Sequence, residues 1–166
     1  MDAKRPVEGG LRHEIRQGLP FHSKGQEAFL SLLRTGDLAK HRFQELFATV
    51  GLTFQQYNVL RILRGAGEEG LPTLEIGNRM IERMPGITRL LDRLEGKGLV
   101  RRERCPEDRR KVFCYISQRG SELLASLDAA VMEADESVFR GVDEADLDTL
   151  IRILDQLRLQ INHGAD

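Results

Sequence analysis

The residues of this chain whose types and spacing could carry chemistry are arginines. Arg89 and Arg93 lie about one helical turn apart in a leucine-rich segment. Further along, Arg109 and Arg110 stand side by side in a short polar segment that begins at Cys105. A guanidinium group is planar, always charged and rich in donors, so it binds phosphates, carboxylates or the edge of a guanine base. We therefore expect recognition of an anion rather than the making or breaking of bonds.

The distribution of charge along the chain supports this expectation better than the total does. The net charge is −1, which by itself argues against a nucleic-acid-binding protein. However, residues 79–112 hold eleven Lys and Arg against six Asp and Glu, whereas residues 121–166 hold three Arg against eleven acids. One segment is suited to meet an anion and the other is not, as in a DNA-binding protein with separate dimerisation helices.

Other kinds of site have little support in the sequence. The four histidines are scattered and the two cysteines lack metal-ligand spacing, so we expect no metal and no cofactor. The segment from Gly65 to Gly70 lacks the Lys and Ser/Thr of a phosphate-binding loop, and nothing positions a nucleophile. We expect a protein that is not an enzyme. Without a long apolar run or a secretory signal, it is expected to be cytoplasmic, with no membrane contact.

The elements that must position the arginines follow from the period of the apolar residues. A helical period with capping residues predicts helices at residues 26–50, 53–64, 73–80, 85–97, 117–139 and 143–162. A period of two predicts strands at residues 99–104 and 111–116, with the turn between them forming a basic tip. The expected fold is mainly α with a small β-hairpin wing, which is a winged helix-turn-helix with N- and C-terminal dimerisation helices.

The fourth predicted helix is the candidate recognition helix. Its apolar residues, Ile87, Leu90, Leu91 and Leu94, are expected to face inward. The residues left to face a DNA groove or backbone are Pro85, Gly86, Thr88, Arg89 and Arg93. Because an α-helix fits the major groove, Arg89 is the best candidate to read a guanine through two donors. The alternative is that Arg89 meets only a phosphate or an acid.

The wing is the second candidate contact. Arg109, Arg110 and Lys111 lie at a narrow turn, a shape that could enter a minor groove, where negative potential concentrates. An ordinary solvated turn is the alternative interpretation.

The outer helices divide the chain into functional parts. We expect an N-terminal arm at residues 1–24, dimerisation helices at residues 25–50 and 118–166, and the winged helix-turn-helix at residues 51–117. The last helix carries a dimerisation stripe of Leu147, Leu150, Leu154, Leu157 and Ile161. A homodimer would hold two recognition helices about 34 Å apart, one DNA turn, and so would bind a pseudo-palindrome. The alternative is a monomer whose outer helices fold back.

The stretch from Leu52 to Leu124 resembles the MarR family of bacterial transcriptional regulators. The resemblance rests on the segments Leu52–Tyr57, Ile87–Leu94, Gly98–Arg102 and Asp108–Arg110. The chain departs from the family pattern at Pro72, at Pro85-Gly86 and at Ser117–Gly120.

This resemblance implies a repressor that acts on double-stranded DNA as a homodimer and is released by a small aromatic or phenolic ligand. The ligand would lie between the DNA-binding and dimerisation parts. The resemblance also implies that the second wing arginine, Arg110, enters the minor groove. Asp108 would brace the wing through an ion pair, for which Arg101 or Arg104 could be the partner.

Two other functions remain open from the sequence. In a redox-sensing regulator, Cys105 would be the reactive thiol, because Arg104 and Arg109 could stabilise its thiolate. Cys114 is expected to be a small core residue. A register that pairs Arg104 with Lys111 would keep the two cysteines too far apart for a disulfide. The other function is a winged helix that binds only proteins, against which the basic wing argues.

Overall fold

The computed structural model describes residues 9–82, 85–104, 108 and 111–163. The chain divides into two compact units, residues 1–128 and residues 129–166. Among the described helices, none is long and apolar enough to cross a lipid bilayer.

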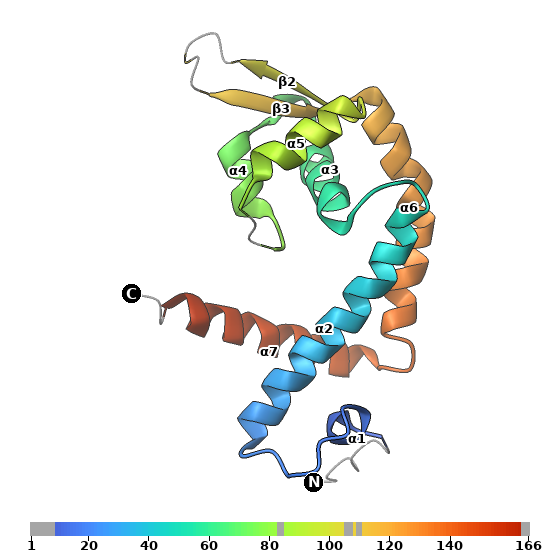
Figure 1. Cartoon of the computed structure of the whole chain (residues 1–166), viewed down its shortest axis with the longest axis vertical. Coiled ribbons are helices and arrows are strands. Elements are labelled where there is room, and N and C mark those ends of the chain that lie inside the picture. Colours follow the sequence, from blue (N-terminus) through green and yellow to red (C-terminus); the bar gives the residue numbers. More distant parts are fainter. Residues whose placement is uncertain (1–8, 83–84, 105–107, 109–110, 164–166) are drawn as a thin grey trace. The chain divides into compact units, whose positions relative to one another are not determined.

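The first unit contains the helix-turn-helix and its wing (Figure 1). Its elements before the wing are the helices α1 (Leu11–Glu14), α2 (Lys24–Ala48) and α3 (Phe54–Ala66), a 3-10 turn η1 (Gly67–Glu69), the short strand β1 (Leu71–Pro72), and the helices α4 (Thr73–Arg79) and α5 (Ile87–Gly96). The wing strands β2 (Val100–Arg104) and β3 (Val112–Ile116) follow, and then α6 (Gln118–Val138) begins.

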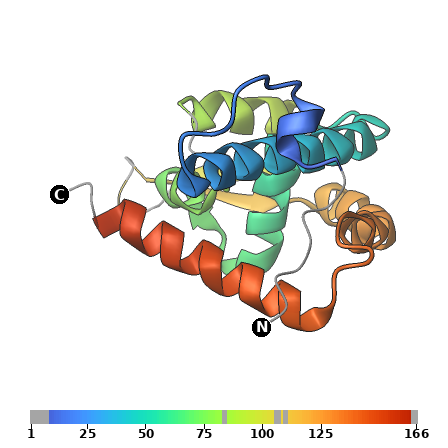
Figure 2. The same ribbon diagram turned by 90° about the horizontal axis from the view of Figure 1, so that it is seen from below.

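Local capping explains where the first long helices begin. The Ser23 hydroxyl accepts a hydrogen bond from the Gln26 amide and caps α2. At α3, Thr53 and Gln56 form the reciprocal capping box that the sequence predicts. The short helix α1 lies beside α2 (Figure 2), where the Arg34 guanidinium donates to the Glu14 carboxylate at 2.7 Å. The arm therefore contains a helical turn that the sequence analysis did not predict.

The sheet has three antiparallel strands in the order β1-β3-β2. Arg102 is opposite Cys114, and Arg104 is opposite Val112. The expected pairing of Arg104 with Lys111 is therefore wrong by one residue. In the observed register Cys114 is fully buried. A shift of the pairing by one residue would exchange the inward-facing and outward-facing side chains of the strand. The third strand, β1, was not predicted because a pair of residues that ends in proline has no readable period.

Helix α5 begins later than the sequence predicts. Its N-cap is Gly86 at φ 94°, a left-handed conformation outside the helix, and the first helical residue is Ile87. Pro85 and Gly86 therefore precede the recognition helix, and the expected opening at Pro85 is wrong. The predicted inward face is confirmed, because Leu90, Leu91 and Leu94 are buried. They meet a core that includes Leu60, Leu63, Ile76 and Leu124.

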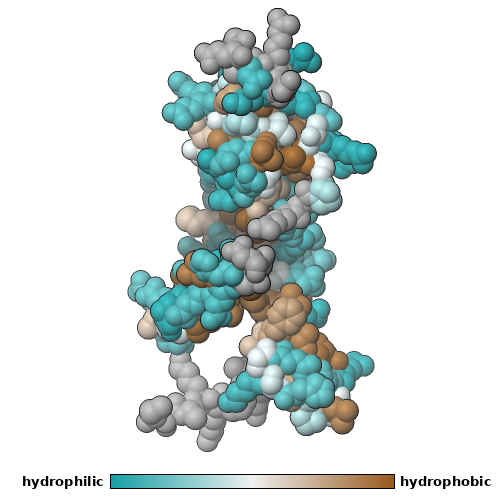
Figure 3. All heavy atoms as spheres, turned by 90° about the vertical axis from the view of Figure 1, so that its left-hand side faces the viewer, coloured by the Kyte–Doolittle hydropathy of each residue, from teal (hydrophilic) through white to brown (hydrophobic). Residues whose placement is uncertain are grey.

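The second unit consists of the end of α6 and the helix α7 (Glu144–His163). The Asp143 carboxylate accepts from the Asp146 amide at 2.8 Å and caps α7, as its position in the sequence predicts. No residue of α7 is buried, although the helix carries many large apolar side chains. Figure 3 shows hydrophobic side chains, in brown, at the surface of the chain among hydrophilic ones in teal.

Candidate nucleic-acid interface

The outward face of α5 carries unpaired cations. Thr88, Arg89 and Arg93 are exposed, as expected for residues that alternate with the buried leucines of the same helix. Within the described part of the chain, no hydrogen bond or ion pair joins Arg89 or Arg93 to another residue. Their guanidinium groups are therefore available to an external anion.

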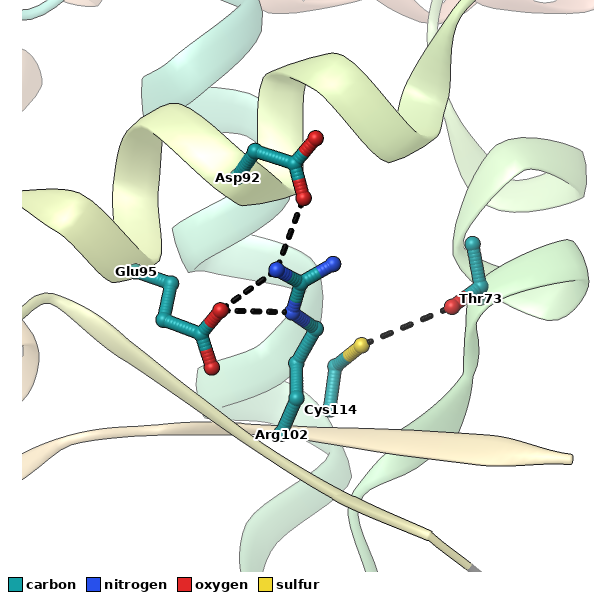
Figure 4. Close-up of polar contacts among 5 residues, drawn as sticks. All are labelled: Thr73, Asp92, Glu95, Arg102 and Cys114. Carbon is teal, nitrogen blue, oxygen red and sulfur yellow. Dashed lines mark hydrogen bonds and ion pairs between the residues drawn. The ribbon is translucent and has the colours of Figure 1, made fainter. Parts of the chain in front are cut away.

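The two acids of the same helix, in contrast, both pair with one arginine of the wing. The Nη2 atom of Arg102, on β2, lies 2.7 Å from the Asp92 carboxylate, and its Nε atom donates to Glu95 at 2.9 Å (Figure 4). The Glu95 hydrogen bond is the main reason that the pKa of Arg102 is raised, and the bond to Asp92 adds to it. Arg102 thus joins β2 to α5, and its single positive charge offsets one of the two negative charges beside Arg89 and Arg93.

The role of Arg102 was not predicted from the sequence. Arg101 and Arg104 were the candidate partners for Asp108, and Arg102 was not expected to pair with α5. A usable signal was present, because Asp92 and Glu95 lie three residues apart on one helix face. The sequence does not show that the next strand, β2, packs against this face of α5.

Arg101 has a different environment from that of Arg102. Its guanidinium carbon lies 4.1 Å from the centroid of the Tyr115 ring, and it forms an ion pair with Glu103. Arg104 and Lys111 are exposed at the ends of the two wing strands. Asp108 is half-buried, and its carbonyl oxygen accepts from the Lys111 amide at 2.9 Å. The bracing role of the Asp108 carboxylate stays a prediction.

Several of the predicted site residues fall outside the described part of the chain. These are the wing arginines Arg109 and Arg110 and the candidate redox residue Cys105. Cys114 is described and lies in the core, with its sulfur 3.7 Å from the Thr73 hydroxyl (Figure 4). Burial raises the pKa of the Cys114 thiol, which disfavours the reactive thiolate. The sequence-based interpretation of Cys114 as a core residue is therefore confirmed.

The predicted dimerisation stripe lies along one face of α7. Leu147 and Leu154 are half-buried, and the other three residues are exposed. Leu150 and Leu157 keep 39% and 40% of their surface in contact with solvent, and Ile161 is still more exposed. Three of the five stripe residues are thus exposed to solvent.

Comparison with known proteins identifies the family. Residues 52–112 match the model of the MarR family. The chain is 30% identical over 130 residues to a candidate transcriptional regulatory protein for the hcr operon of Thauera aromatica, and the match covers 77% of each chain. This protein belongs to the MarR family. Its resemblance to the family, inferred above from the segments around α5 and the wing, is thereby confirmed.

Solved structures support the same assignment for this MarR-family chain. It is 41% identical to a MarR transcription factor from Planctomyces limnophilus, with a TM-score of 0.64 over 82% of this chain and 99% of that one. Its fold also matches Sco3205, a MarR family transcriptional regulator from Streptomyces coelicolor solved in complex with DNA. That match has a TM-score of 0.74, 22% identity and coverage of 85% and 91%. The expected winged helix-turn-helix fold is confirmed, and the protein is a transcriptional regulator.

Proposed function

We propose that this MarR-family protein is a sequence-specific DNA-binding repressor that acts as a homodimer on a pseudo-palindromic operator. The observation that carries the proposal is the division of charge on α5. Arg89 and Arg93 have no partner within the described part of the chain, whereas Asp92 and Glu95 are both paired with Arg102. A groove-sized helix with this charge pattern is suited to meet a polyanion. The DNA-bound structure of Sco3205, which shares the fold, supports the same kind of partner.

Within this proposal the residues of α5 and the wing have separate roles. Arg89, on the first turns of α5, donates twice to a guanine in the major groove, and Thr88 and Arg93 contact bases or phosphates beside it. Gly86 has no side chain and precedes the helix, so that it and Pro85 allow close approach of the backbone to the DNA. The wing enters the adjacent minor groove, which it contacts through Arg109, Arg110 and Lys111.

The uncovered apolar residues of α7 and α2 support the homodimer. Leu150, Leu157 and Ile161 on α7, and Phe29 and Leu33 on α2, are large side chains in contact with solvent. Their burial between two copies would be favourable by about 25 cal/mol per Å² of apolar surface. The two copies would then present α5 twice, with the separation that a pseudo-palindrome requires.

A surface hollow supports regulation by a small ligand. It has a volume of about 660 Å³ and lies where the α2–α3 connection, the end of α5 and the start of α6 meet. Its lining combines apolar residues, among them Leu52 and Leu123, with the two cations Lys97 and Arg119 and one acid, Glu122. An aromatic or phenolic acid would place its ring on the leucines and its carboxylate near the cations. We propose that such a molecule binds here and favours a dimer that no longer fits DNA.

The function is tested by selecting duplexes from a random-sequence pool with the full-length protein and measuring affinities by fluorescence anisotropy. The expected result is an inverted-repeat sequence, bound by two copies per duplex. A promoter that contains the selected sequence should be silenced when the protein is present. Recovery of no sequence, or binding that does not weaken with salt, would point to a winged helix that binds proteins. In the same assay, 2- and 4-hydroxybenzoate serve as ligand probes, with Arg119→Ala as the variant that should lose the response.

A further inference from the structure

Helix α2 changes its surroundings along its length. Phe43 and Phe47 pack into the first unit, where the Phe47 ring stacks on Tyr57 with 4.0 Å between the ring centroids. On the same helical stripe, Phe29 and Leu33 near the other end are exposed. Lys40 lies on this stripe between the two regions. Lys40 therefore lies at the boundary between the packed part and the exposed part of α2.

At this position α2 is joined to the turn of the helix-turn-helix. The Lys40 ammonium donates to one carboxylate oxygen of Glu82, which follows α4. The other carboxylate oxygen accepts from the Gln55 side-chain amide, on α3, at 2.8 Å. About two thirds of each charged side chain is shielded from solvent. The hydrogen bond from Lys40 is the largest cause that lowers the pKa of Glu82, so the carboxylate is held in its charged form.

A second buried contact fixes the residue before Glu82. The Asn58 side chain, on α3, is 1% exposed, and its Oδ1 atom accepts from the Ile81 amide at 3.1 Å. Ile81 and Glu82 are thus held by α3, through Asn58 and Gln55 respectively. Glu82 is also held by α2, through Lys40. Glu82 precedes Ile87, the first residue of α5, by five positions, and residues 83–84 between them lie outside the described part of the chain. Because so short a segment has limited reach, the position of Glu82 restricts where α5 can begin.

We propose that Glu82 is a positioning residue that sets the recognition helix relative to α2, and thereby couples the exposed half of α2 to DNA recognition. The inference rests on the proposed sequence-specific DNA binding. A force that tilts α2, such as its packing against a second copy, acts on Lys40 and through Glu82 on the turn before α5. The contact joins residues 42 positions apart in the chain. Neither residue touches DNA in this proposal.

Neutralising Glu82 should have two effects on the affinity for DNA, and these effects have opposite signs. Removal of a negative charge near α5 should by itself tighten binding to any duplex. Loss of positioning should instead weaken binding to the selected duplex only. We expect Glu82→Gln to lower the preference for the selected duplex over a scrambled one by about five- to tenfold. The double variant Lys40→Glu with Glu82→Lys keeps the net charge and should restore most of this preference.

The matched control is Glu75→Gln. Glu75 accepts from Arg79 at 2.7 Å within α4, so this variant removes the same charge from a nearby ion pair that joins no two elements. It should leave the preference unchanged. If Glu75→Gln and Glu82→Gln behave alike, or if the swapped pair restores nothing, Glu82 has no positioning role.

A readout without DNA separates this inference from the proposed function. Amide hydrogen exchange over residues 87–92, at the start of α5, should be faster in Glu82→Gln than in the wild-type protein and in Glu75→Gln. If random-pool selection fails but exchange rises as expected, the DNA proposal is wrong and the positioning contact stands. If exchange is unchanged in Glu82→Gln, the inference is overturned whatever the DNA result.

Discussion

The guanidinium group of Arg102 lies 2.7 Å from the carboxylate of Asp92 and joins the wing strand β2 to the helix α5, the proposed recognition helix. The same group donates to Glu95, one turn further along α5. Only 22% of the Arg102 side chain is exposed, so the contact is made largely out of solvent. This single residue both joins the wing to α5 and pairs with the two acids of that helix.

Replacement of Arg102 should therefore destabilise the fold. Arg102→Met leaves Asp92 and Glu95 side by side without a cation, and we expect the free energy of unfolding to fall by about 1 to 2 kcal/mol. The loss is small because both carboxylates are partly exposed, so that solvent screens their charges. Urea denaturation measures the change. Arg158→Met, which breaks the exposed pair with Asp155 within α7, should change stability by less than about 0.5 kcal/mol. Equal losses in the two variants would contradict the role given to Arg102.

Gly120 should tolerate no side chain, because α6 starts in close contact with the residue before β2. A Cβ atom at this position would lie 2.3 Å from the Leu99 carbonyl oxygen and 2.9 Å from an Ile116 methylene carbon. Gly120→Ala should lower the free energy of unfolding by about 1 to 3 kcal/mol. Gly65→Ala in α3 meets nothing within 4 Å and should stabilise by up to about 1 kcal/mol. Thermal unfolding followed by circular dichroism distinguishes the two, and a stable Gly120→Ala variant would show that this contact can relax.

Arg89 should determine sequence preference, whereas Arg93 should contribute more uniformly. If Arg89 donates twice to a guanine, Arg89→Ala removes about 1 to 3 kcal/mol of discrimination at one base pair in each half-site. Selection from a random pool with the variant should then give a site that is degenerate at that position. Arg93→Ala serves as the comparison and should weaken binding while leaving the selected sequence unchanged. An unaltered site with Arg89→Ala would assign Arg89 to a phosphate contact.

Arg110 should act through the electrostatic part of binding. We expect Arg110→Ala to weaken binding to all duplexes and to make the slope of log K against log salt shallower by about one unit. Affinities at several salt concentrations give the slope directly. Arg152→Ala on α7 removes an equal charge from the second unit, outside the proposed DNA-binding elements, and should leave the slope as it is in the wild-type protein. A slope that Arg110→Ala does not change would exclude the wing from DNA binding.

The stripe on α7 should determine the oligomeric state. Leu157→Glu places a charge on the face proposed to meet a second copy, and we expect monomers in sedimentation velocity at concentrations where the wild-type protein is dimeric. Leu159→Glu is the control, because Leu159 is 59% exposed on the opposite side of the same helix. A dimer that resists Leu157→Glu, or that is lost equally with Leu159→Glu, would show that this stripe is not the interface.

The sequence by itself determined the elements and the sides they present. Helical and strand periods are local properties, so Leu90, Leu91 and Leu94 could be assigned inward and Arg89 and Arg93 outward from their spacing alone. The burial of Cys114 followed in the same way from the alternation along β3. Asp143 and the capping box at Thr53 were also readable, since each capping interaction spans only a few residues.

The tertiary structure alone decided which charged groups meet. Arg102 pairs with α5, and Glu82 with Lys40, because β2 and the turn after α4 return past elements distant in the chain. A long charged side chain can reach many partners, and no period in the sequence selects among them. The start of α5 belongs to the same class, because the spacing of residues does not show that Gly86 takes a left-handed conformation outside the helix. Spacing along a chain fixes what each helix exposes, whereas packing between distant segments fixes what those exposed groups touch.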